Sequence, residues 1–490
     1  METIRSWKLN HSNLFVECDS GIGQELNEFF SFYVPGYKFM PAFRNKLWDG
    51  KIRLFSRATN ELPAGLYYHL ESFCVQRGYK LETARSDYGT PDEKIRIRPD
   101  DLQSFLDSLD LPFPLRKYQF ECVGEAITRK RAILLSPTGS GKSFIIYALL
   151  RWYLETYDQK ILIIVPTTSL VEQMYSDFAE YGFDVERNVH KIYSGRDKDT
   201  DKRVVVSTWQ SVYRLQKQWF HQFGCVFGDE CHGFKSKSLM TIMNKCELAE
   251  FRFGTTGTLD GAQTHELVLQ GLFGKIYRVT TTKSLQDDNT LAKLKINRIE
   301  LEYSEKIRKE FGPKTYQEEI DFIVEHEKRN KFIKNLALDQ KGNTLVLYNY
   351  VDKHGKPLFD MIQEAAVAGR KVFFVSGNTA TSDREAIRGI VEKQKDAIIV
   401  ASLGTFSTGI NIKELHNIIF ASPSKSQIRV LQSIGRGLRK SGADITTKLY
   451  DISDNLSWQA RQNYSLLHSY ERLKMYQKEQ FEHTTFKVSL

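Results

Sequence analysis

The sequence has few cysteines, no long apolar run and no low-complexity tract. Its six cysteines include no C-x-x-C pair, and Cys225 stands inside the apolar run FGCVFGDE. We therefore expect reduced, buried thiols, as in a cytosolic protein, and no disulfide framework. No run approaches the ~18 apolar residues of a membrane span, and the charged start METIRSWKLN lacks the apolar core of a signal peptide. From these absences we expect neither export nor a membrane partner.

The charge balance is basic. Lys and Arg number 69 against 60 for Asp and Glu, which gives a formal net charge of +9 over 490 residues. This excess favours a polyanionic partner such as nucleic acid, although many basic proteins bind none. The length predicts about three or four domains, each with its own hydrophobic core.

Short apolar runs alternate with amphipathic segments of helix length in two separate blocks. Continuous apolar runs in this rhythm indicate buried parallel strands and βαβ units. The sequence thus predicts two α/β domains in tandem. The runs of the first block are 131–135, 160–165, 203–207 and 225–229, and those of the second are 344–349, 371–377, 397–402, 417–422 and 448–452.

The first hundred residues differ from both blocks. In AFRNKLWDGKIRLF the pair Asp49-Gly50 stands between two strand-like flanks, which is a hairpin signal. We predict a small α+β domain there. The predicted boundaries are 1–100 for this domain, 101–290 for the first α/β domain, 291–340 for a helical connector, 341–455 for the second α/β domain and 456–490 for a helical tail.

LLSPTGSGKS, residues 134–143, follows an apolar run and leads into a helix-compatible segment. Gly139 and Gly141 allow backbone N–H groups to turn inward around phosphates at a helix N-terminus, with Thr138 and Ser140 in the same loop. Lys142 would reach the β and γ phosphates of ATP, and Ser143 would bind Mg²⁺. The strict pattern has Gly where this chain has Ser136.

VFGDECHGF, residues 226–234, ends another apolar run with two acids. At the carboxyl edge of a parallel sheet, Asp229 is suited to Mg²⁺ and Glu230 to polarising the attacking water. Cys231 and His232 suggest a zinc site, but no second pair stands at zinc spacing. We expect His232 to link the nucleotide state to neighbouring loops.

QSIGRGLRK, residues 432–440, places Gln432, Arg436 and Arg439 at i, i+4 and i+7 on one face of a predicted helix. The face could simply be solvated. The glycines between the arginines instead favour close approach to another group. We expect both arginines to reach the γ-phosphate held by Lys142 when an interdomain cleft closes, as arginine fingers in cis, with Gln432 beside them.

Together these motifs resemble those of superfamily 2 helicases from about residue 113 to 455. LRKYQ is similar to the Q motif, in which Gln119 reads adenine, and VPTTSLVEQ, STWQS, DECH, TTGT, TFSTGIN and QSIGRGLRK follow in the family's order. The resemblance implies an α/β fold of two tandem RecA-like parallel-sheet motor domains. It implies contact with DNA by Thr167, Thr168, Ser207, Thr208 and Gln210, and coupling roles for Thr256, Thr258, Thr408 and Gly409.

The chain is also similar to the UvsW helicases of tailed phages. The likeness lies in FFSFYVPGYKFMPAFRNKLWDGKIRL, in KILIIVPTT, in KTYQEEI and in FSTGI followed by VLQSIGR. It implies an ATP-driven DNA translocase that remodels forks, D-loops and Holliday junctions by branch migration in recombination, repair and replication. It also implies a monomeric motor in the host cytoplasm, working beside single-strand-binding or recombination proteins. The P-loop departs from the UvsW pattern, which indicates a diverged relative.

The N-terminal segment 33–53 interleaves aromatic and basic side chains. Such interleaving suits phosphate contacts with base stacking, although a hairpin with an aromatic core and solvated charges fits equally well. We expect the charges to touch DNA and Trp48 to be core. The basic residues are Lys38, Arg44, Lys46, Lys51 and Arg53.

Other functions remain open at this point. An RNA helicase would carry the same motor motifs. A non-hydrolysing, ATP-gated clamp is disfavoured by the presence of Glu230, Arg436 and Arg439. A nuclease is weaker still, because neither PD pair, at 91 and at 99, is followed at ordinary range by an acid-x-Lys pair.

Overall fold

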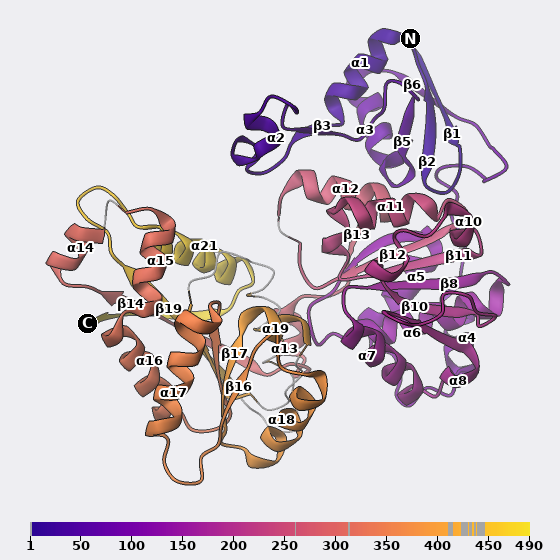
Figure 1. Ribbon diagram of the computed structural model, residues 1–490. Coiled ribbons are helices and arrows are strands. Elements are labelled where there is room, and N and C mark those ends of the chain that lie inside the picture. The colour runs from indigo at the N-terminus through magenta and orange to yellow at the C-terminus, as the bar shows by residue number, and fades with distance from the viewer. Residues whose placement is uncertain are drawn as a thin grey trace. The chain divides into compact units, whose positions relative to one another are not determined.

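The computed structural model describes residues 2–259, 261–311, 314–409, 415–422, 430, 434–435, 438 and 446–490. By backbone proximity the chain divides into two compact units. One comprises Met1–Ser136 with Gly141–Val279, and the other comprises Pro137–Ser140 with Thr280–Leu490. Each unit has its own sheets and its own hydrophobic core (Figure 1).

A small α+β domain opens the first unit. Its sheet has the order β5-β2-β1-β6, in which β1 pairs antiparallel with β2 and parallel with β6. Alternate residues of β1 and β2 are buried, as a strand with one covered face requires. Ile4, Val16, Leu26 and Phe73 meet in one core. The elements are β1 Thr3–Lys8, β2 Asn13–Glu17, α1 Ser20–Phe29, β5 Glu61–Pro63, η2 Ala64–Leu66, α3 Tyr67–Arg77 and β6 Lys80–Thr83.

The hairpin predicted at Asp49-Gly50 is wrong in detail. The two paired strands are β3 (Ser31–Tyr33) and β4 (Lys51–Arg53), and the residues between them form short helical turns instead of a strand. Pro41 supplies the reason, because it occupies the first turn of a helix, where its fixed φ and missing N–H are tolerated. The turns are η1 Tyr37–Phe39 and α2 Pro41–Arg44.

This N-terminal domain docks on the first large sheet through buried polar contacts. The Arg252 guanidinium donates 2.6 Å to Ser12 Oγ, and Arg131 Nη2 donates 2.6 Å to the carbonyl of His11. Burial lowers the pKa of Arg252 to about 10. A Cβ on Gly65 would lie 1.9 Å from the Gln270 carbonyl, so the two backbones are in direct contact. The N-terminal domain is therefore part of the same unit as the first sheet.

The first large sheet has seven parallel strands in the order β13-β7-β12-β11-β8-β10-β9. Helices cover both faces, and each face has its own apolar cluster. The four apolar runs predicted as strands form β7, β8, β10 and β11. The strands are β7 Arg131–Leu135, β8 Lys160–Val165, β9 Val189–Ile192, β10 Val204–Thr208, β11 Phe223–Asp229, β12 Phe251–Thr256 and β13 Ile276–Arg278. The helices are α4 Pro99–Ser108, α5 Lys117–Arg129, α6 Lys142–Thr156, α7 Thr168–Glu180, α8 Val185–Asn188, α9 Trp209–Val212, α10 Lys217–Phe220, η3 Cys231–Lys235, α11 Lys237–Lys245 and α12 Gln263–Phe273.

The second unit contains another seven-stranded parallel sheet, in the order β16-β17-β15-β18-β19-β14-β20. All five runs predicted as strands are found in it. The two sheets confirm two tandem RecA-like domains behind a small α+β domain. The strands are β14 Lys293–Glu302, β15 Thr344–Tyr348, β16 Val372–Val375, β17 Ile398–Ser402, β18 Asn417–Phe420, β19 Thr446–Asn455 and β20 Glu482–Ser489. The helices are α13 Thr282–Asp287, α14 Glu305–Phe311, α15 Tyr316–Glu325, α16 Glu327–Asp339, η4 Val351–Gly355, α17 Lys356–Ala365, α18 Thr381–Gln394, α19 Leu403–Gly409 and α21 Tyr464–Lys478.

Two boundary predictions need correction. The supposed helical connector, 291–340, begins with β14, which lies inside the second sheet, and only its later part forms helices α14 to α16. The supposed helical tail, 456–490, holds α21 but ends in β20, an edge strand parallel to β14. Within these segments, β14 and β20 are strands because they pair with strands that are far away in sequence.

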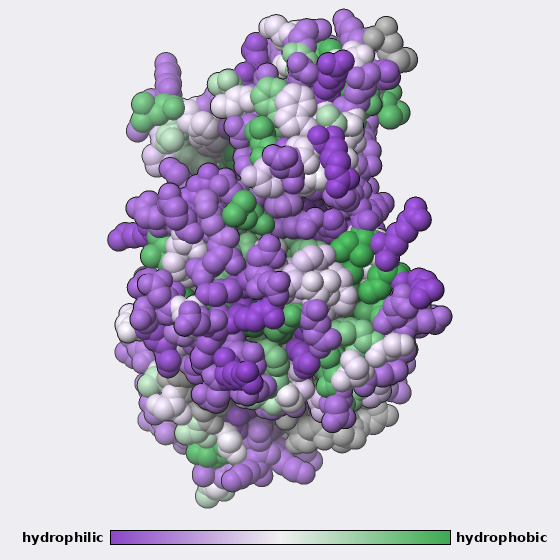
Figure 2. All heavy atoms as spheres, turned by 90° about the vertical axis from the view of Figure 1, so that its right-hand side faces the viewer, coloured by the Kyte–Doolittle hydropathy of each residue, from purple (hydrophilic) through white to green (hydrophobic). Residues whose placement is uncertain are grey.

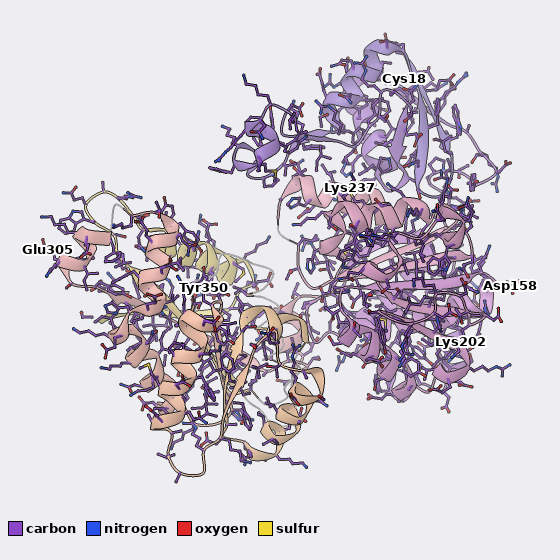
Figure 3. The ribbon with its side chains drawn as sticks, in the orientation of Figure 1. Cys18, Asp158, Lys202, Lys237, Glu305 and Tyr350 are labelled. Carbon is purple, nitrogen blue, oxygen red and sulfur yellow. The ribbon has the colours of Figure 1, made fainter. Side chains whose placement is uncertain are left out.

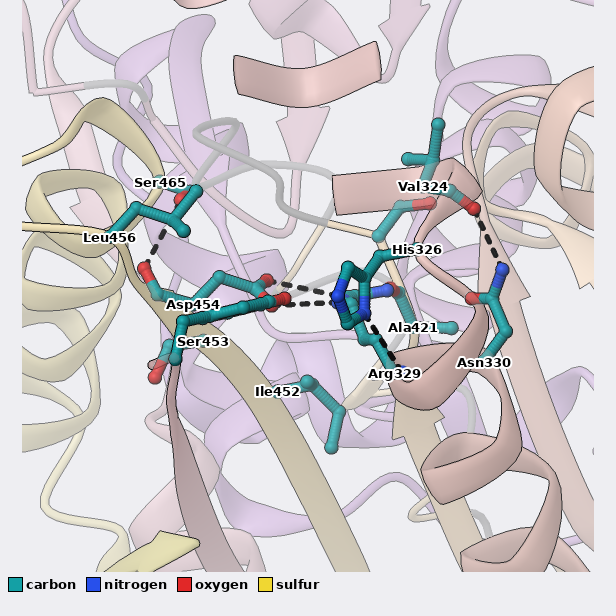
Figure 4. A network of polar contacts seen from close by, with 12 residues as sticks. Val324, His326, Arg329, Asn330, Ala421, Ile452, Ser453, Asp454, Leu456 and Ser465 are labelled. Atoms are coloured by element: carbon teal, nitrogen blue, oxygen red, sulfur yellow. Dashed lines mark hydrogen bonds and ion pairs between the residues drawn. The ribbon is translucent and has the colours of Figure 1, made fainter. Parts of the chain in front are cut away.

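A buried ion pair fixes the carboxyl end of the second sheet (Figure 4). Arg329 on α16 donates from Nε and Nη2 to the two carboxylate oxygens of Asp454, at 2.7 and 3.0 Å, and neither side chain is exposed. Arg329 Nη2 also donates 2.8 Å to the carbonyl of Ala421, directly after β18, and Tyr303 donates 2.8 Å to Asp454. One guanidinium thus joins α16, β18 and β19.

The surface and the thiols match an ordinary globular protein. The face in Figure 2 is mainly hydrophilic, with scattered hydrophobic patches. In the part of the chain that the structure describes, no helix combines the length and the apolar character that crossing a membrane requires. All six cysteines are free thiols. Five are buried, and Cys18 is half-buried between β2 and α1 (Figure 3).

Candidate functional site

Three motifs that are far apart in the sequence meet at one edge of the first sheet. The P-loop follows β7, the acid pair ends β11 and TTGT ends β12, and these strands are neighbours in the order β7-β12-β11. The register pairs Thr256 with Leu135 and Thr255 with Asp229. Since all the strands are parallel, their carboxyl ends lie together, at the edge where ligands bind in such sheets.

The P-loop has the geometry of a phosphate cradle. Gly139 and Gly141 adopt left-handed φ values of 86° and 79°, and Gly141 is the N-cap of α6. Successive N–H groups in such a turn face inward, and the helix dipole adds positive potential. Lys142 Nζ donates 3.2 Å to the Ser136 carbonyl, so its charge lies over the loop. Ser140 donates 2.7 Å to the carbonyl of Pro137, which closes the turn that contains Thr138.

Gln119, the residue of the Q motif, lies against this loop. Its side chain is 4% exposed, and its Oε1 accepts 2.9 Å from the backbone N–H of Arg116, which caps α5. A Cβ added at Gly141 would lie 2.5 Å from Gln119 Nε2. Two features therefore require glycine at position 141, namely the left-handed φ and the Gln119 amide packed against its Cα. This contact places a buried amide beside the predicted phosphate site.

The acid pair is electrostatically frustrated. Asp229 Oδ1 accepts 2.7 Å from Thr255 Oγ1. Burial and the neighbouring charge of Glu230 raise the pKa of Asp229, while the Thr255 hydrogen bond and the charge of Lys142 oppose that rise. Two adjacent acids at such a site favour a bound cation, which would relieve their repulsion. The hydroxyl of Ser143 and the carboxylate of Asp229 are oxygen donors of the kind that Mg²⁺ prefers.

Glu230 has an unusual backbone. Its φ of 50° and ψ of 48° lie in the left-handed region, which few residues other than glycine adopt, and it is the N-cap of η3. Such strain is typical of active sites, where it aims a side chain.

His232 connects the acid pair to TTGT. Its Nδ1 lies 3.0 Å from Thr256 Oγ1 and 3.3 Å from Glu230 Oε2. Thr256 Oγ1 donates its own hydrogen 2.9 Å to the Thr258 carbonyl, so it accepts from His232, and the imidazole proton belongs on Nδ1. The structure thus brings together His232, Thr256 and Thr258, the residues predicted to couple.

Sequence reasoning missed Tyr181. Its hydroxyl lies 2.9 Å from Ser143 Oγ, the predicted Mg²⁺ ligand, and its ring packs 4.9 Å from Phe144. Phe113, half exposed, packs 4.7 Å from Phe144 and 6.1 Å from Tyr181. Nothing in the local sequence around Tyr181 signals the contact, because Tyr181 lies directly after the end of α7 and meets the P-loop helix only in the fold.

The predicted nucleic-acid residues of the first sheet lie at or just after the ends of β8 and β10, which are neighbours with Val165 paired to Thr208. Thr167 caps α7 and Thr168 is exposed. Ser207 and Thr208 are buried, and their hydroxyls bond to the Thr208 carbonyl and to Ser211. Within STWQS only Gln210 presents an exposed side chain among the predicted residues. Contact with DNA stays a prediction. Because the side chains of Ser207 and Thr208 are buried, the prediction for these two residues concerns only their backbone groups.

The basic residues of the N-terminal segment fall into two groups. Lys38, Arg44 and Lys46 are exposed. Lys51 lies over the Tyr33 ring, with Nζ 4.9 Å from its centroid, and Arg53 pairs with Asp49. Trp48, predicted as core, is only half-buried and donates 2.8 Å to the Lys51 carbonyl.

Several predicted residues of the second domain cannot be placed. Gln432, Arg436 and Arg439 lie outside the described residues. Thr408 and Gly409 belong to α19 by their backbone. Leu438 of this motif is buried, and its carbonyl accepts 2.9 Å from the N–H of Ala292.

Three family models match the chain. They are described as "Type III restriction enzyme, res subunit" over residues 112–261, "DNA helicase UvsW, N-terminal" over 4–83 and "Helicase conserved C-terminal domain" over 327–441. The first spans β7 to β12 of the first large sheet, the third spans β15 to β18 of the second, and the second model lies within the small N-terminal domain.

Among curated proteins, the ATP-dependent DNA helicase uvsW of Enterobacteria phage T4 is 38% identical over 501 residues, which covers 98% of each chain. The DNA 3'-5' translocase XPB2 of Sulfurisphaera tokodaii is 24% identical over 69% of this chain and 82% of its own.

Among solved structures, T4 UvsW matches with a TM-score of 0.52 at 36% identity, over 99% of both chains. A fragment of an HsdR subunit from Vibrio vulnificus YJ016 matches with a TM-score of 0.58 at 17% identity, over 90% of this chain and 85% of its own. That second likeness shows the fold alone.

Proposed function

Because this chain belongs to the UvsW family of ATP-dependent DNA helicases, we propose that it uses ATP hydrolysis to remodel branched DNA. The proposed substrates are forks, D-loops and Holliday junctions, and the proposed reaction is branch migration in phage recombination, repair and replication. One observation carries this step beyond a generic motor. The likeness to T4 UvsW extends through residues 4–83, a domain that the two motor models do not cover.

For hydrolysis, we assign the described residues of the first sheet as follows. The loop with Thr138, Gly139, Ser140 and Gly141 holds the phosphates by backbone N–H groups, and Lys142 neutralises the β and γ oxygens. Gln119 reads the adenine. Glu230 orients and polarises the attacking water.

Mg²⁺ is part of the proposal. Ser143 and Asp229 would hold it, and when bound it supplies positive charge to the phosphate oxygens. We keep the predicted role of arginine fingers for Arg436 and Arg439, with Gln432 beside them. Thr408 and Gly409 likewise keep their predicted coupling role.

The proposed coupling runs through His232. A change at Glu230 during hydrolysis reaches Thr256 through one imidazole, and Thr256 in turn holds the Thr258 carbonyl. The DNA-facing residues Thr168 and Gln210 follow strands of the same sheet. The first sheet carries both sets of residues. A movement of its strand ends at the nucleotide can therefore also move the residues that contact nucleic acid.

Nucleic-acid contact is proposed at two places on the first unit. Motor residues Thr167, Thr168 and Gln210 contact the backbone of one strand, without reading sequence. Lys38, Arg44 and Lys46 of the N-terminal domain add a second contact, so a substrate with two duplex arms engages both.

We also propose a monomeric motor in the host-cell cytoplasm, with single-strand-binding or recombination proteins as partners. The domain boundaries remain those predicted, except that the second domain begins with β14 and ends with β20.

An ATPase assay on matched nucleic acids tests the proposal. Single-stranded, linear duplex, forked and four-way DNA, and an RNA of equal length, are compared at the same nucleotide concentration and salt. The proposal expects the strongest stimulation by forked and four-way DNA. Stronger stimulation by RNA would favour an RNA helicase instead.

A further inference from the structure

A buried histidine lies at the carboxyl end of the second sheet. His354 belongs to η4, the π-helical turn that follows β15, and its side chain is fully buried. Its Nδ1 lies 2.9 Å from Oγ of Ser422, a buried residue that comes two positions after β18. The same hydroxyl accepts 3.1 Å from the backbone N–H of Asn349. Because β15 and β18 are neighbours, one serine hydroxyl joins the segments that follow two paired strands.

The surroundings of His354 are costly to form, which argues against a histidine that only fills the core. π-Helical turns are rare and are frequent at functional sites. Nε2 of His354 is buried and has no hydrogen-bond partner among the described residues, so this atom loses its hydration without compensation. Burial and the charge of Arg329 hold the pKa of His354 well below its ordinary value, so the imidazole is neutral. An apolar side chain would avoid these costs, and the contact with Ser422 accounts for the imidazole.

The turn that carries His354 is fixed against β15. The N–H of Gly355 donates 2.8 Å to the Tyr350 carbonyl. A Cβ at Gly355 would lie 2.5 Å from the Tyr348 ring, whose hydroxyl donates 3.1 Å to the Val375 carbonyl. The backbone beside His354 therefore packs directly on a ring that is itself held in place.

Two buried side chains hold the residues that follow β18. The N–H of Ala421 donates 3.0 Å to the Leu347 carbonyl, and the Ala421 carbonyl accepts from Arg329 (Figure 4). The next residue, Ser422, contacts His354. Residues 423–440, which we call the arginine segment, follow directly in the sequence. This segment contains the predicted arginine fingers and their neighbour, which are Arg436, Arg439 and Gln432.

The other partner of Ser422 lies at the surface. Asn349 comes directly after β15, and its side chain is exposed. Ligands of parallel sheets bind at the carboxyl ends of the strands, which is where Asn349 lies. A group that contacts Asn349 can therefore act on the start of the arginine segment through a single hydroxyl.

We propose that His354 is a positioning residue for ATP hydrolysis: through the Ser422 hydroxyl it fixes the start of the arginine segment and ties it to Asn349. The inference rests on the proposed function and deepens it by naming what holds the proposed arginine fingers in place. Arginine fingers act mainly in the transition state. Loss of the His354 contact therefore lowers turnover and leaves nucleotide binding nearly intact.

The test compares the full-length variants Ser422→Ala and His354→Leu with the unaltered protein, on four-way DNA. Each variant should lower kcat about 10-fold or more, because a misplacement of about 1 Å far from the chemistry can cost about 100-fold. KM for ATP should stay within about 2-fold, as expected when only a transition-state interaction is lost. Binding of ADP with aluminium fluoride, a transition-state analogue, should weaken about 10-fold, while binding of ADP alone should not change. A merely structural role would not separate these two ligands.

Further variants isolate the hydrogen bond. Ser422→Thr keeps the hydroxyl and His354→Asn keeps an N–H donor near the position of Nδ1, so both should retain most of the activity. The double variant His354→Leu, Ser422→Ala should be no worse than either single variant, because both residues act through one bond. The matched control is Ser453→Ala on β19, which removes another buried hydroxyl of the same sheet, bonded 3.2 Å to the Ile299 carbonyl. It should behave like the unaltered protein.

Undiminished kcat and undiminished analogue binding in Ser422→Ala would overturn the inference. Losses that add in the double variant, or that Ser453→Ala shares, would overturn it as well. If His354→Leu does not fold, Ser422→Ala, which removes a single oxygen atom, carries the test. The proposed function fails by a different result, namely no preference of the unaltered protein for four-way over linear DNA in ATPase stimulation.

Discussion

His232 Nδ1 lies 3.0 Å from Thr256 Oγ1, and the same nitrogen is 3.3 Å from Glu230 Oε2. One imidazole therefore touches both the acid assigned to water activation and the first threonine of TTGT. A hydrogen-bonded group shared between two motifs can transmit a change at one of them to the other, which gives the coupling role a physical basis.

Substituting His232 tests this link. His232→Ala should leave basal hydrolysis close to that of the unaltered protein, because Glu230, Lys142 and the P-loop are untouched. Stimulation by DNA should fall about 5-fold or more, the size of a typical coupling between sites. His232→Asn, whose amide can still donate to Thr256, is the matched control and should keep most of the stimulation. Undiminished stimulation by DNA in His232→Ala would show that His232 does not couple hydrolysis to DNA contact.

Tyr181→Phe tests the unexpected contact at Ser143, the proposed Mg²⁺ ligand. The Tyr181 hydroxyl lies 2.9 Å from Ser143 Oγ and would compete with a bound metal for that oxygen. Without it, half-maximal hydrolysis should need about 2- to 5-fold less free Mg²⁺, because a lost hydrogen bond of about 0.5–1 kcal/mol no longer has to be broken. The measurement is a Mg²⁺ titration of ATPase activity at saturating ATP. A higher Mg²⁺ requirement would show that Tyr181 helps to orient Ser143 instead.

Asp229→Asn should separate stability from activity. Burial and the Glu230 charge raise the pKa of Asp229, so the folded state holds its proton more tightly than the unfolded chain does. The contribution of this group to the free energy of unfolding therefore falls as pH rises from the ordinary carboxyl range towards the raised pKa. Asn carries no charge and escapes this loss. Hydrolysis should be abolished, while the Tm without nucleotide should rise by about 2–4 °C, the shift that about 1 kcal/mol produces in a domain of this size.

Thermal melts at two pH values measure the size and the sign of this change in Tm. The advantage of Asp229→Asn over the unaltered protein should be larger at about pH 7 than at about pH 5. A lower Tm for the variant at both pH values would show that the carboxylate stabilises the fold.

Arg329→Met should destabilise the second domain. The substitution leaves Asp454 buried without its bidentate partner, which typically costs about 3–5 kcal/mol. Combining it with Asp454→Leu removes both charges and should recover much of that loss. Urea unfolding followed by far-UV circular dichroism measures the difference. A double variant as unstable as the single one would show that the pair contributes through packing and not through charge.

Much of the motor could be predicted from the sequence because its signals are local. The P-loop glycines, the acids after β11 and the apolar runs of both sheets each depend on residues close in the chain. Gln119 was predictable only through the resemblance, since its contact with Gly141 is formed by the fold.

The incorrect predictions have two causes, which are pairing with partners distant in sequence and a local turn signal that a nearby residue overrides. β20 is exposed along most of its length, so its residues show no buried face, and it is a strand only because it pairs with β14. Asp49-Gly50 between strand-like flanks predicts a hairpin in the segment that links β3 and β4, but Pro41 starts a helical turn within that segment. Phe39 and Leu47 are apolar and still exposed, which no hydrophobic pattern predicts.

Deleting residues 1–100 would disturb the motor domain as well as remove the N-terminal domain. Arg252 and Arg131 donate into this domain and would lose the acceptors at Ser12 and His11, which leaves buried charges unpaired. The triple variant Lys38→Ala, Arg44→Ala, Lys46→Ala keeps the interface. It should weaken DNA binding and flatten the dependence of affinity on salt, because fewer phosphate contacts release fewer counterions. An unchanged salt slope would show that these bases face solvent in the complex.

The most direct test of branch remodelling is the conversion of a mobile four-way DNA junction into two duplexes. Fluorescently labelled junctions are incubated with the full-length protein, Mg²⁺ and ATP, and the products are separated on a native gel. We predict duplex products that require ATP hydrolysis and disappear in Lys142→Ala, which lacks the cation proposed to neutralise the β and γ phosphates but keeps the N-terminal domain. An intact junction, in a preparation whose ATPase is stimulated equally by linear duplex, would contradict it.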